Sequence, residues 1–122
     1  MRSLSSVRVF WPDEPSLEAS IREYSSRLLA REEVVGVYLC GSRAKETHTV
    51  TSDVDLLVLI RGGTEPALLR PHDRIPAYLP DSFPVGLDLF VYTEEEARSS
   101  PFVRRLMEEA VPLLEEEGAP GV

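Results

Sequence analysis

Residues 34–60 read VVGVYLCGSRAKETHTVTSDVDLLVLI and contain the clearest strand and turn patterns of the chain. Its first part, 34–40, is short, apolar and β-branched at its start, and it ends at Gly41. This pattern predicts a buried strand that leads into a tight turn. The last part, Asp53 to Ile60, predicts a second strand that opens with two aspartates and continues as an apolar run. The segment that joins these strands holds the most informative residues of the chain.

Two helices are expected outside this stretch. The first begins at Pro15 and Ser16 and runs to about Arg31, because apolar residues recur there at steps of three and four. Ser100 as N-cap and Pro101 at the first helical position begin the second, which should end near residue 110. Its apolar stripe comprises Phe102, Val103, Leu106, Met107 and Ala110. The acidic run 94–96 also suits a helix N-terminus, where negative charge is favourable.

The remaining segments complete the predicted sheet. Residues 85–92 alternate as a third strand, and 111–114 predict a short edge strand because proline is tolerated at an edge. Between 61 and 84 the chain has two glycines and five prolines, so at most a short helical piece around 75–79 is expected. The fold class that follows is α/β (α+β), with a mixed β-sheet of three to four strands flanked by helices.

Composition limits the kinds of protein that this chain can be. With 122 residues, 43% of them hydrophobic, it predicts one globular domain over 1–122. Thirteen Lys and Arg against twenty-one Asp and Glu give a net charge of −8, which argues against broad contact with nucleic acid or with an anionic membrane. The single cysteine, Cys40, excludes an intramolecular disulfide and a four-cysteine zinc site. No apolar run is long enough for a signal peptide or a membrane span, so we expect a cytoplasmic protein.

The turn after the first strand is a candidate anion site. Gly41 and Ser42 stand between a buried strand and a helix-capable stretch, so free backbone N–H groups and the Ser42 hydroxyl could bind a phosphate. Arg43 and Lys45 add positive charge. The alternative is a plain glycine turn in which Ser42 caps the following helix.

Aspartates open the second strand and interrupt the third. Asp53 and Asp55 are two residues apart, so both carboxylates project to one face of a strand, where their repulsion calls for a cation. Hard oxygen ligands without a histidine or cysteine cluster fit Mg²⁺. Asp88 is the single charge in the third strand and could join the pair if the two strands are neighbours. The alternatives are a solvated junction at Asp53 and Asp55 and an outward-facing Asp88.

In combination, these residues resemble the minimal nucleotidyltransferase domains of the DNA polymerase beta-like nucleotidyltransferase superfamily. The family pattern is Gly-Ser, ten residues, Asp-x-Asp and a third Asp on a later strand. It is met here by Gly41, Ser42, Asp53, Asp55 and Asp88. The resemblance in the order of elements covers a core of about 16–114.

The resemblance implies an enzyme that uses ATP or another nucleoside triphosphate together with two Mg²⁺ ions. Nucleotide binding falls to Gly41, Ser42, Arg43 and Lys45, with Ser42 and the turn backbone on the β- and γ-phosphates. Asp53, Asp55 and Asp88 are the catalytic and metal-binding residues: the first two ligate both metals. Asp88 ligates the catalytic metal and helps to deprotonate an acceptor hydroxyl, which then attacks the α-phosphate.

Family members are often encoded beside an all-helical HEPN-type protein as a toxin and antitoxin pair. The resemblance thus implies transfer of a nucleotide, AMP in the first instance, to a hydroxyl that such a partner could supply. Two other readings stay open: an antitoxin or regulatory subunit that binds nucleotide and chiefly masks a partner, and a structural domain whose aspartates are coincidental.

Overall fold

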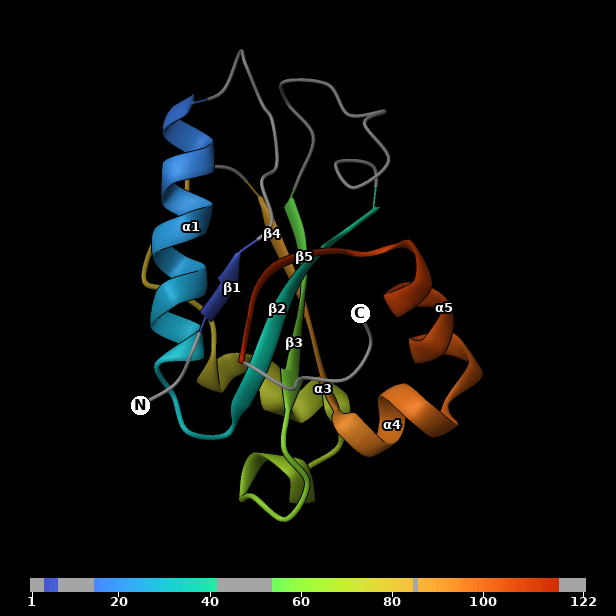
Figure 1. Cartoon of the computed structure of the whole chain (residues 1–122). Helices are drawn as coiled ribbons and strands as arrows, with labels where there is room; N and C mark the ends of the chain where they lie inside the picture. The colour runs from blue at the N-terminus through green and yellow to red at the C-terminus, as the bar shows by residue number, and fades with distance from the viewer. Residues whose placement is uncertain (1–3, 7–14, 42–53, 85, 117–122) are drawn as a thin grey trace.

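A five-stranded mixed sheet separates one long helix from two short ones in the computed structural model, which describes residues 4–6, 15–41, 54–84 and 86–116 (Figure 1). The order across the sheet is β1-β5-β2-β3-β4. β3 and β4 are parallel, and the other neighbouring pairs are antiparallel. The strands are β1 (Leu4–Ser6), β2 (Val34–Cys40), β3 (Val54–Ile60), β4 (Leu87–Thr93) and β5 (Val111–Glu116). The predicted mixed sheet is confirmed.

The two central strands are buried on both faces. All seven residues of β2 are buried, and in β3 only Asp55 is partly exposed. Such strands have near-continuous apolar sequences rather than alternating ones, because helices cover both sides of the sheet. The apolar runs at 34–40 and 56–60 therefore predicted these strands correctly.

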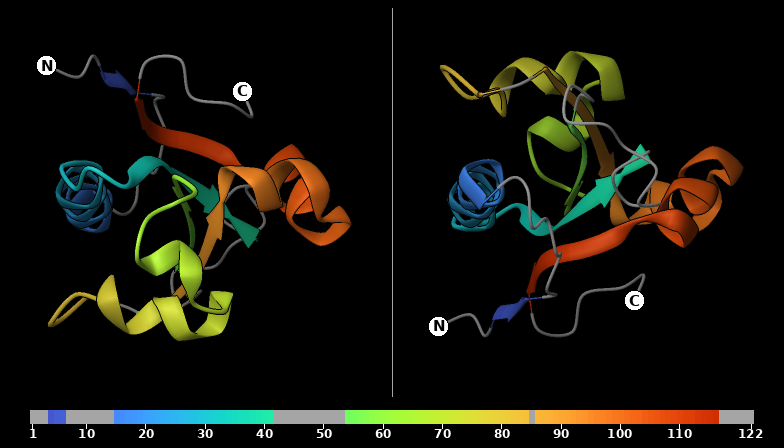
Figure 2. Two further views of the ribbon diagram at one scale, coloured as in Figure 1. Left: turned by 90° about the horizontal axis from the view of Figure 1, so that it is seen from below. Right: turned by 90° about the horizontal axis from the view of Figure 1, so that it is seen from above.

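One face of the sheet is covered by α1 (Pro15–Leu29). Its apolar residues pack against alternate residues of β2, β3 and β4, in the cluster Leu17, Ile21, Tyr24, Leu28 and Leu29. The two end views of Figure 2 show α1 on one side of the strands and α4 and α5 on the other. None of the described helices is long and apolar enough to cross a membrane.

The opposite face is covered by α4 (Glu94–Ser99) and α5 (Pro101–Glu109). Thr93 caps α4 through a capping box with Glu96, so the acidic run begins a helix as predicted. Ser100 caps α5 by accepting a hydrogen bond from the Val103 amide at 3.4 Å. One residue of the predicted stripe is wrong: Phe102 is 56% exposed and lies edge-on to Tyr92 instead of facing the sheet.

The connection from β3 to β4 is more helical than the sequence predicts. It contains η1 (Pro66–Leu68), α3 (Pro71–Arg74) and η2 (Ile75–Ala77). Each of these short helices has a proline in its first turn, where the fixed φ of proline suits a helix and its missing N–H is not needed. The prolines of this connection therefore start helical turns.

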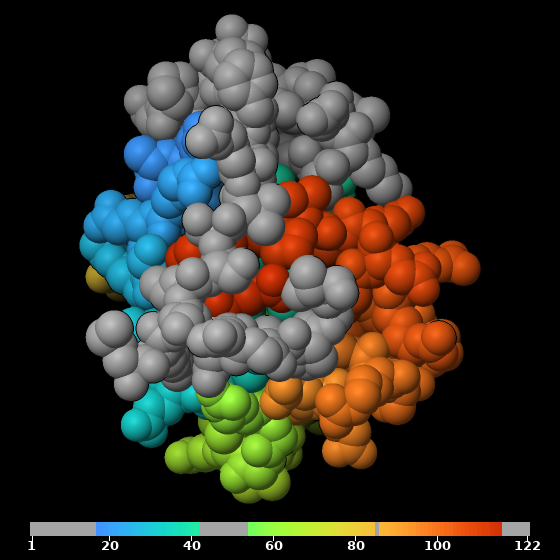
Figure 3. All heavy atoms as spheres, in the orientation of Figure 1, coloured from blue at the N-terminus to red at the C-terminus, as the bar shows by residue number. Residues whose placement is uncertain are grey.

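At the other side of the sheet, the position of β5 corrects the prediction of an edge strand. β5 lies between β1 and β2, and β1 forms the edge. The sequence did not indicate β1, whose three residues pair with 114–116. Pro112 is opposite Tyr38, where the register between β2 and β5 shifts, so an inner strand accommodates the proline. In Figure 3, atoms of β5 (red-orange) are visible between α1 (blue) and α5 (orange).

Candidate active site

Two carboxylates stand side by side at one end of the sheet. Asp55 is the second residue of β3 and Asp88 the second residue of β4, and the parallel register pairs them directly. Neighbouring strands lie about 4.8 Å apart, and paired residues project to the same face. That face is the one covered by α4 and α5, because Leu57 and Phe90, each two residues further along, pack in the core on that side.

The turn after β2 meets the same pair. Cys40, the last residue of β2, pairs with Asp55, and Gly41 follows it with φ 71°. A Cβ built on Gly41 would overlap Oδ2 of Asp55. Glycine is needed here for two reasons, since the backbone is left-handed and the carboxylate occupies the space of a side chain. The Gly41 end of the predicted phosphate loop therefore adjoins one of the predicted metal ligands.

The negative charge at this end of the sheet affects Cys40. Burial raises the pKa of its thiol, and the carboxylate of Asp55 raises it further, to about 12. The thiol therefore stays protonated at neutral pH and is a poor nucleophile or metal ligand. The oxygen atoms of the aspartates are the groups at this site that can hold a cation.

The donor set fits a magnesium ion. Two carboxylates on one face of adjacent strands, with Asp55 partly buried and Asp88 exposed, offer hard oxygen ligands, and Mg²⁺ usually takes its remaining ligands from phosphate and water. Within 15–41, 54–84 and 86–116, no group of three or more His, Cys, Asp or Glu could hold a metal. The predicted third ligand, Asp53, lies outside the described residues, as do Ser42, Arg43 and Lys45. Of the predicted site residues, Gly41, Asp55 and Asp88 are the ones that the structure brings together.

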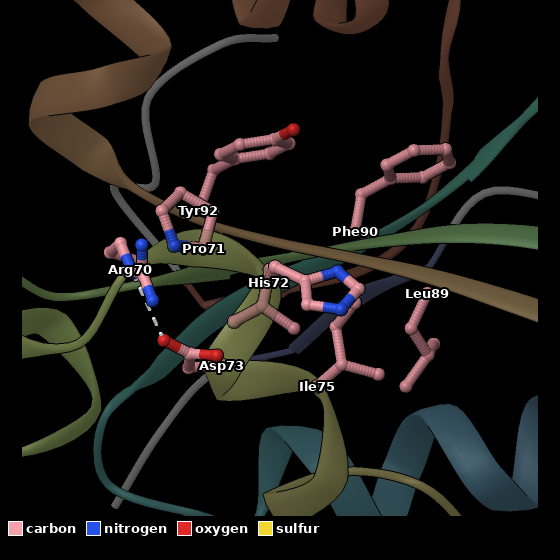
Figure 4. Close-up of a pocket in the computed structure, with 9 residues that line it drawn as sticks. Arg70, Pro71, His72, Asp73, Ile75, Leu89, Phe90 and Tyr92 are labelled. Atoms are coloured by element: carbon pink, nitrogen blue, oxygen red, sulfur yellow. Dashed lines mark hydrogen bonds and ion pairs between the residues drawn. The ribbon is translucent and has the colours of Figure 1, made fainter.

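A hollow beside this site was not anticipated from the sequence. It has a volume of about 530 Å³ and lies between α3 and the outer edge of β4 (Figure 4). Neither Asp55 nor Asp88 lines it, although its β4 residues begin at Leu89, directly after Asp88. Figure 4 shows Phe90 and Tyr92 on one side of the β4 ribbon and Leu89 with Ile75 on the other. The segment that forms one wall of the hollow, within residues 61–84, is rich in proline, and for that reason its sequence did not indicate the short helices.

Arg74 covers the outer edge of β4 at Val91. Its side chain is 3% exposed and bonds Glu96 of α4, with Nη1 to Oε1 at 2.6 Å. Nη1 also donates to the carbonyl of Val91 in β4 at 3.1 Å. Further bonds reach the carbonyls of Pro66, Ala67 and Leu69. One guanidinium therefore holds the β3–β4 connection against the strand that carries Asp88.

Comparison with known proteins agrees with this geometry. A family model described as "Nucleotidyltransferase domain" matches residues 21–114. The chain belongs to that family. The match spans β2, β3 and β4 and hence both aspartates, and the nucleotidyltransferase domain continues into β5.

One solved structure shows the same fold. It is a crystal structure from Sulfolobus solfataricus that is described as a "putative nucleotidyltransferase". The two chains share 21% sequence identity with a TM-score of 0.58, over 80% of this chain and 78% of the other. No curated protein matches this sequence. The predicted nucleotidyltransferase fold is confirmed.

Proposed function

We propose that this nucleotidyltransferase domain transfers a nucleoside monophosphate, AMP from ATP, to an acceptor hydroxyl with the help of Mg²⁺. The observation that supports the proposal is the direct pairing of Asp55 with Asp88 beside the left-handed Gly41. Like charges on paired positions are destabilising by themselves, so their adjacency suits a site that binds a cation. Membership of the nucleotidyltransferase family supplies the class of reaction.

In the proposal, one set of residues binds the nucleotide and another binds the metal. The turn at Gly41 and Ser42, with Arg43 and Lys45, holds the β- and γ-phosphates. Asp53, Asp55 and Asp88 hold magnesium, two ions in the full site. A metal held by these carboxylates would supply positive charge against the developing charge of the phosphate oxygens.

Asp88 receives the proton in the proposed reaction. It is the exposed member of the described pair and lies on an outer strand, so an acceptor can reach it. The acceptor oxygen forms a bond to the α-phosphorus, and the bond from that phosphorus to the bridging oxygen of the β-phosphate breaks. Pyrophosphate leaves with the electron pair, and the hydroxyl proton passes to the Asp88 carboxylate and then to water. Alignment of these groups supplies much of the rate enhancement.

The partner in the proposal is a HEPN-type helical protein that offers the acceptor hydroxyl. A net charge of −8 favours association with a basic partner through electrostatic steering. Broad nucleic-acid binding is not part of the proposal.

Thermal unfolding with ligands tests the site. We expect ATP and Mg²⁺ together, but neither alone, to raise the melting temperature of the wild type by several degrees, since ligand at about 100 times its Kd stabilises by roughly 2.7 kcal/mol. The matched variant is Asp55→Asn, which keeps the size of the side chain and removes its charge. An equal rise in Asp55→Asn, or no rise in the wild type, would contradict the proposal.

A further inference from the structure

Among the residues that the structure describes, several backbone groups at the outer edge of β4 have no hydrogen-bond partner. The Val54 amide donates to the Gly86 carbonyl, and the alternation of a strand then directs the backbone of Asp88 and Phe90 toward β3. The backbone groups of Leu87, Leu89, Val91 and Thr93 point the other way. Of these, the Thr93 amide bonds Glu96 and the Val91 carbonyl bonds Arg74.

The part of this edge from Leu87 to the amide of Val91 is therefore available for hydrogen bonding within the described residues. Within the described residues, no hydrogen bond reaches the outward N–H and C=O groups of Leu87 and Leu89 or the N–H of Val91. An exposed row of such groups is a template for another strand, and proteins usually cover or blunt it. Here Arg74 and α3 cover the edge from the carbonyl of Val91 onward.

The hollow of about 530 Å³ beside this edge is lined by residues of β4 and of the β3–β4 connection. Side chains of a strand alternate between two faces. One set would meet Phe90 and Tyr92, and the other would enter the apolar floor formed by Ile75 and Leu89 (Figure 4). The His72 ring extends into the same space, whereas Arg70 and Asp73 pair with each other at 3.2 Å at the margin.

We propose that the open edge of β4, Leu87 to Val91, docks an extended segment of a partner polypeptide as an added strand and so presents a hydroxyl side chain to Asp88. The inference rests on the proposed function and names the acceptor: a serine, threonine or tyrosine on a strand. A docked residue opposite Asp88 projects to the same face as Asp88, with Cβ atoms about 5 Å apart. The hydroxyl oxygen then bonds the α-phosphorus of ATP, pyrophosphate leaves, and the proton passes to Asp88.

The open edge also selects among possible partners. Backbone groups in a row bond another extended backbone and cannot bond a helix, whose own amides are already paired. A helical partner can therefore use this edge only through a tail outside its helices. Asp55 and Asp88 at the end of the edge, and the net charge of −8, favour a neutral or basic segment.

The test uses the full chain with ATP labelled at the α-phosphate, Mg²⁺ and synthetic peptides. The peptides have the sequence KVTVYVTVK, with serine or threonine replacing the central tyrosine in two further versions. In parallel versions, single amides are methylated in turn along the peptide. We expect methylation of every second amide to lower labelling about tenfold, because only alternate amides of an added strand face β4, and methylation of the others to have little effect.

Two variants locate the docking edge. His72→Trp fills the hollow and should lower peptide labelling about tenfold. Leu79→Trp adds the same ring at an exposed position outside the hollow and should leave labelling unchanged. Both variants should keep the rise in melting temperature with ATP and Mg²⁺.

The outcomes separate the two proposals. Two results together support strand docking. Labelling by the wild type alternates with the position of the methylated amide, and labelling is lost in His72→Trp but not in Leu79→Trp. A uniform response to methylation, equal labelling by both variants, or labelling of added RNA instead of the peptides overturns it. So does a complete lack of peptide labelling by a protein that still binds ATP with Mg²⁺, and in that case the proposed function stands. Absence of that binding overturns the proposed function itself.

Discussion

Glu96 accepts hydrogen bonds from two different parts of the chain: the guanidinium of Arg74 at 2.6 Å and the amide of Thr93 at 2.8 Å. The first bond ties α3 to α4 around the outer edge of β4, and the second completes the cap of α4. The carboxylate of Glu96 thus joins the proposed docking edge to the helices on the aspartate face.

Glu96→Gln should destabilise the fold by on the order of 3 kcal/mol, because it leaves the Arg74 guanidinium buried without a negative partner. Glutamine keeps an oxygen for the Thr93 amide, so the loss reports mainly on the ion pair. Urea unfolding measures it. The control is Glu95→Gln on the exposed side of the same helix turn, which should change stability little. Equal stabilities of the two variants would show that the ion pair contributes nothing.

Stability should fall in acid partly through the same residue. Burial alone would raise the pKa of Glu96, but the hydrogen bonds from Arg74 and from the Thr93 backbone outweigh it and lower the pKa below 4.5. A folded-state pKa below the unfolded one means that the stabilisation is present above the unfolded value and is lost as pH falls through the folded value. Unfolding midpoints of the wild type and Glu96→Gln should therefore converge in acid, as the pH falls through the lowered folded-state pKa of Glu96. A constant gap between them from neutral pH to acid contradicts this assignment.

Gly41→Ala should abolish the stabilisation by ATP with Mg²⁺. The new Cβ would displace the Asp55 carboxylate, and the left-handed backbone adds about 1 kcal/mol of strain. Gly63→Ala is a matched control, because Gly63 has φ 77° and open space around its Cα. Both variants should lose stability, but only Gly41→Ala should lose ligand binding in a thermal shift assay. Retained binding in Gly41→Ala would separate the turn from the nucleotide site.

Asp88→Asn should stop nucleotide transfer without harming the fold. In the absence of metal its melting temperature should be equal to or slightly above that of the wild type, because removing one of two paired like charges relieves up to about 1 kcal/mol of repulsion. Asp81→Asn, at another exposed aspartate, controls for the change in net charge. Transfer of label from ATP measures activity, and undiminished transfer by Asp88→Asn would remove Asp88 from the mechanism.

Much of the fold could be predicted from the sequence because its strongest patterns are local. The apolar runs of β2 and β3, the helical spacing in α1 and the Ser100-Pro101 start of α5 depend only on neighbouring residues. Pairing between distant segments does not. The position of β5 inside the sheet, the short β1 and the bond from the Tyr38 hydroxyl to Glu115 at 2.7 Å join residues far apart in the chain.

Of the candidate site, too, only the features that depend on neighbouring residues could be predicted from the sequence. Alternation along a strand indicated that Asp55 projects to one face, but the pairing of Asp55 with Asp88 depends on how the β3–β4 connection sets the register. That connection consists of three short helices held by Arg74, and its prolines gave no sign of where they would pack. The open edge of β4 follows from the same packing.

In the proposed site, Asp55 and Asp88 bind a metal ion together. Crystals of the full chain grown with Mn²⁺ and a non-hydrolysable ATP analogue would show that ion directly through its anomalous scattering. We predict a peak within bonding distance, about 2.0 to 2.2 Å, of a carboxylate oxygen of each aspartate and of the nucleotide phosphates. Nucleotide bound elsewhere on the chain, or bound here with no peak between Asp55 and Asp88, would contradict metal binding by this pair of aspartates.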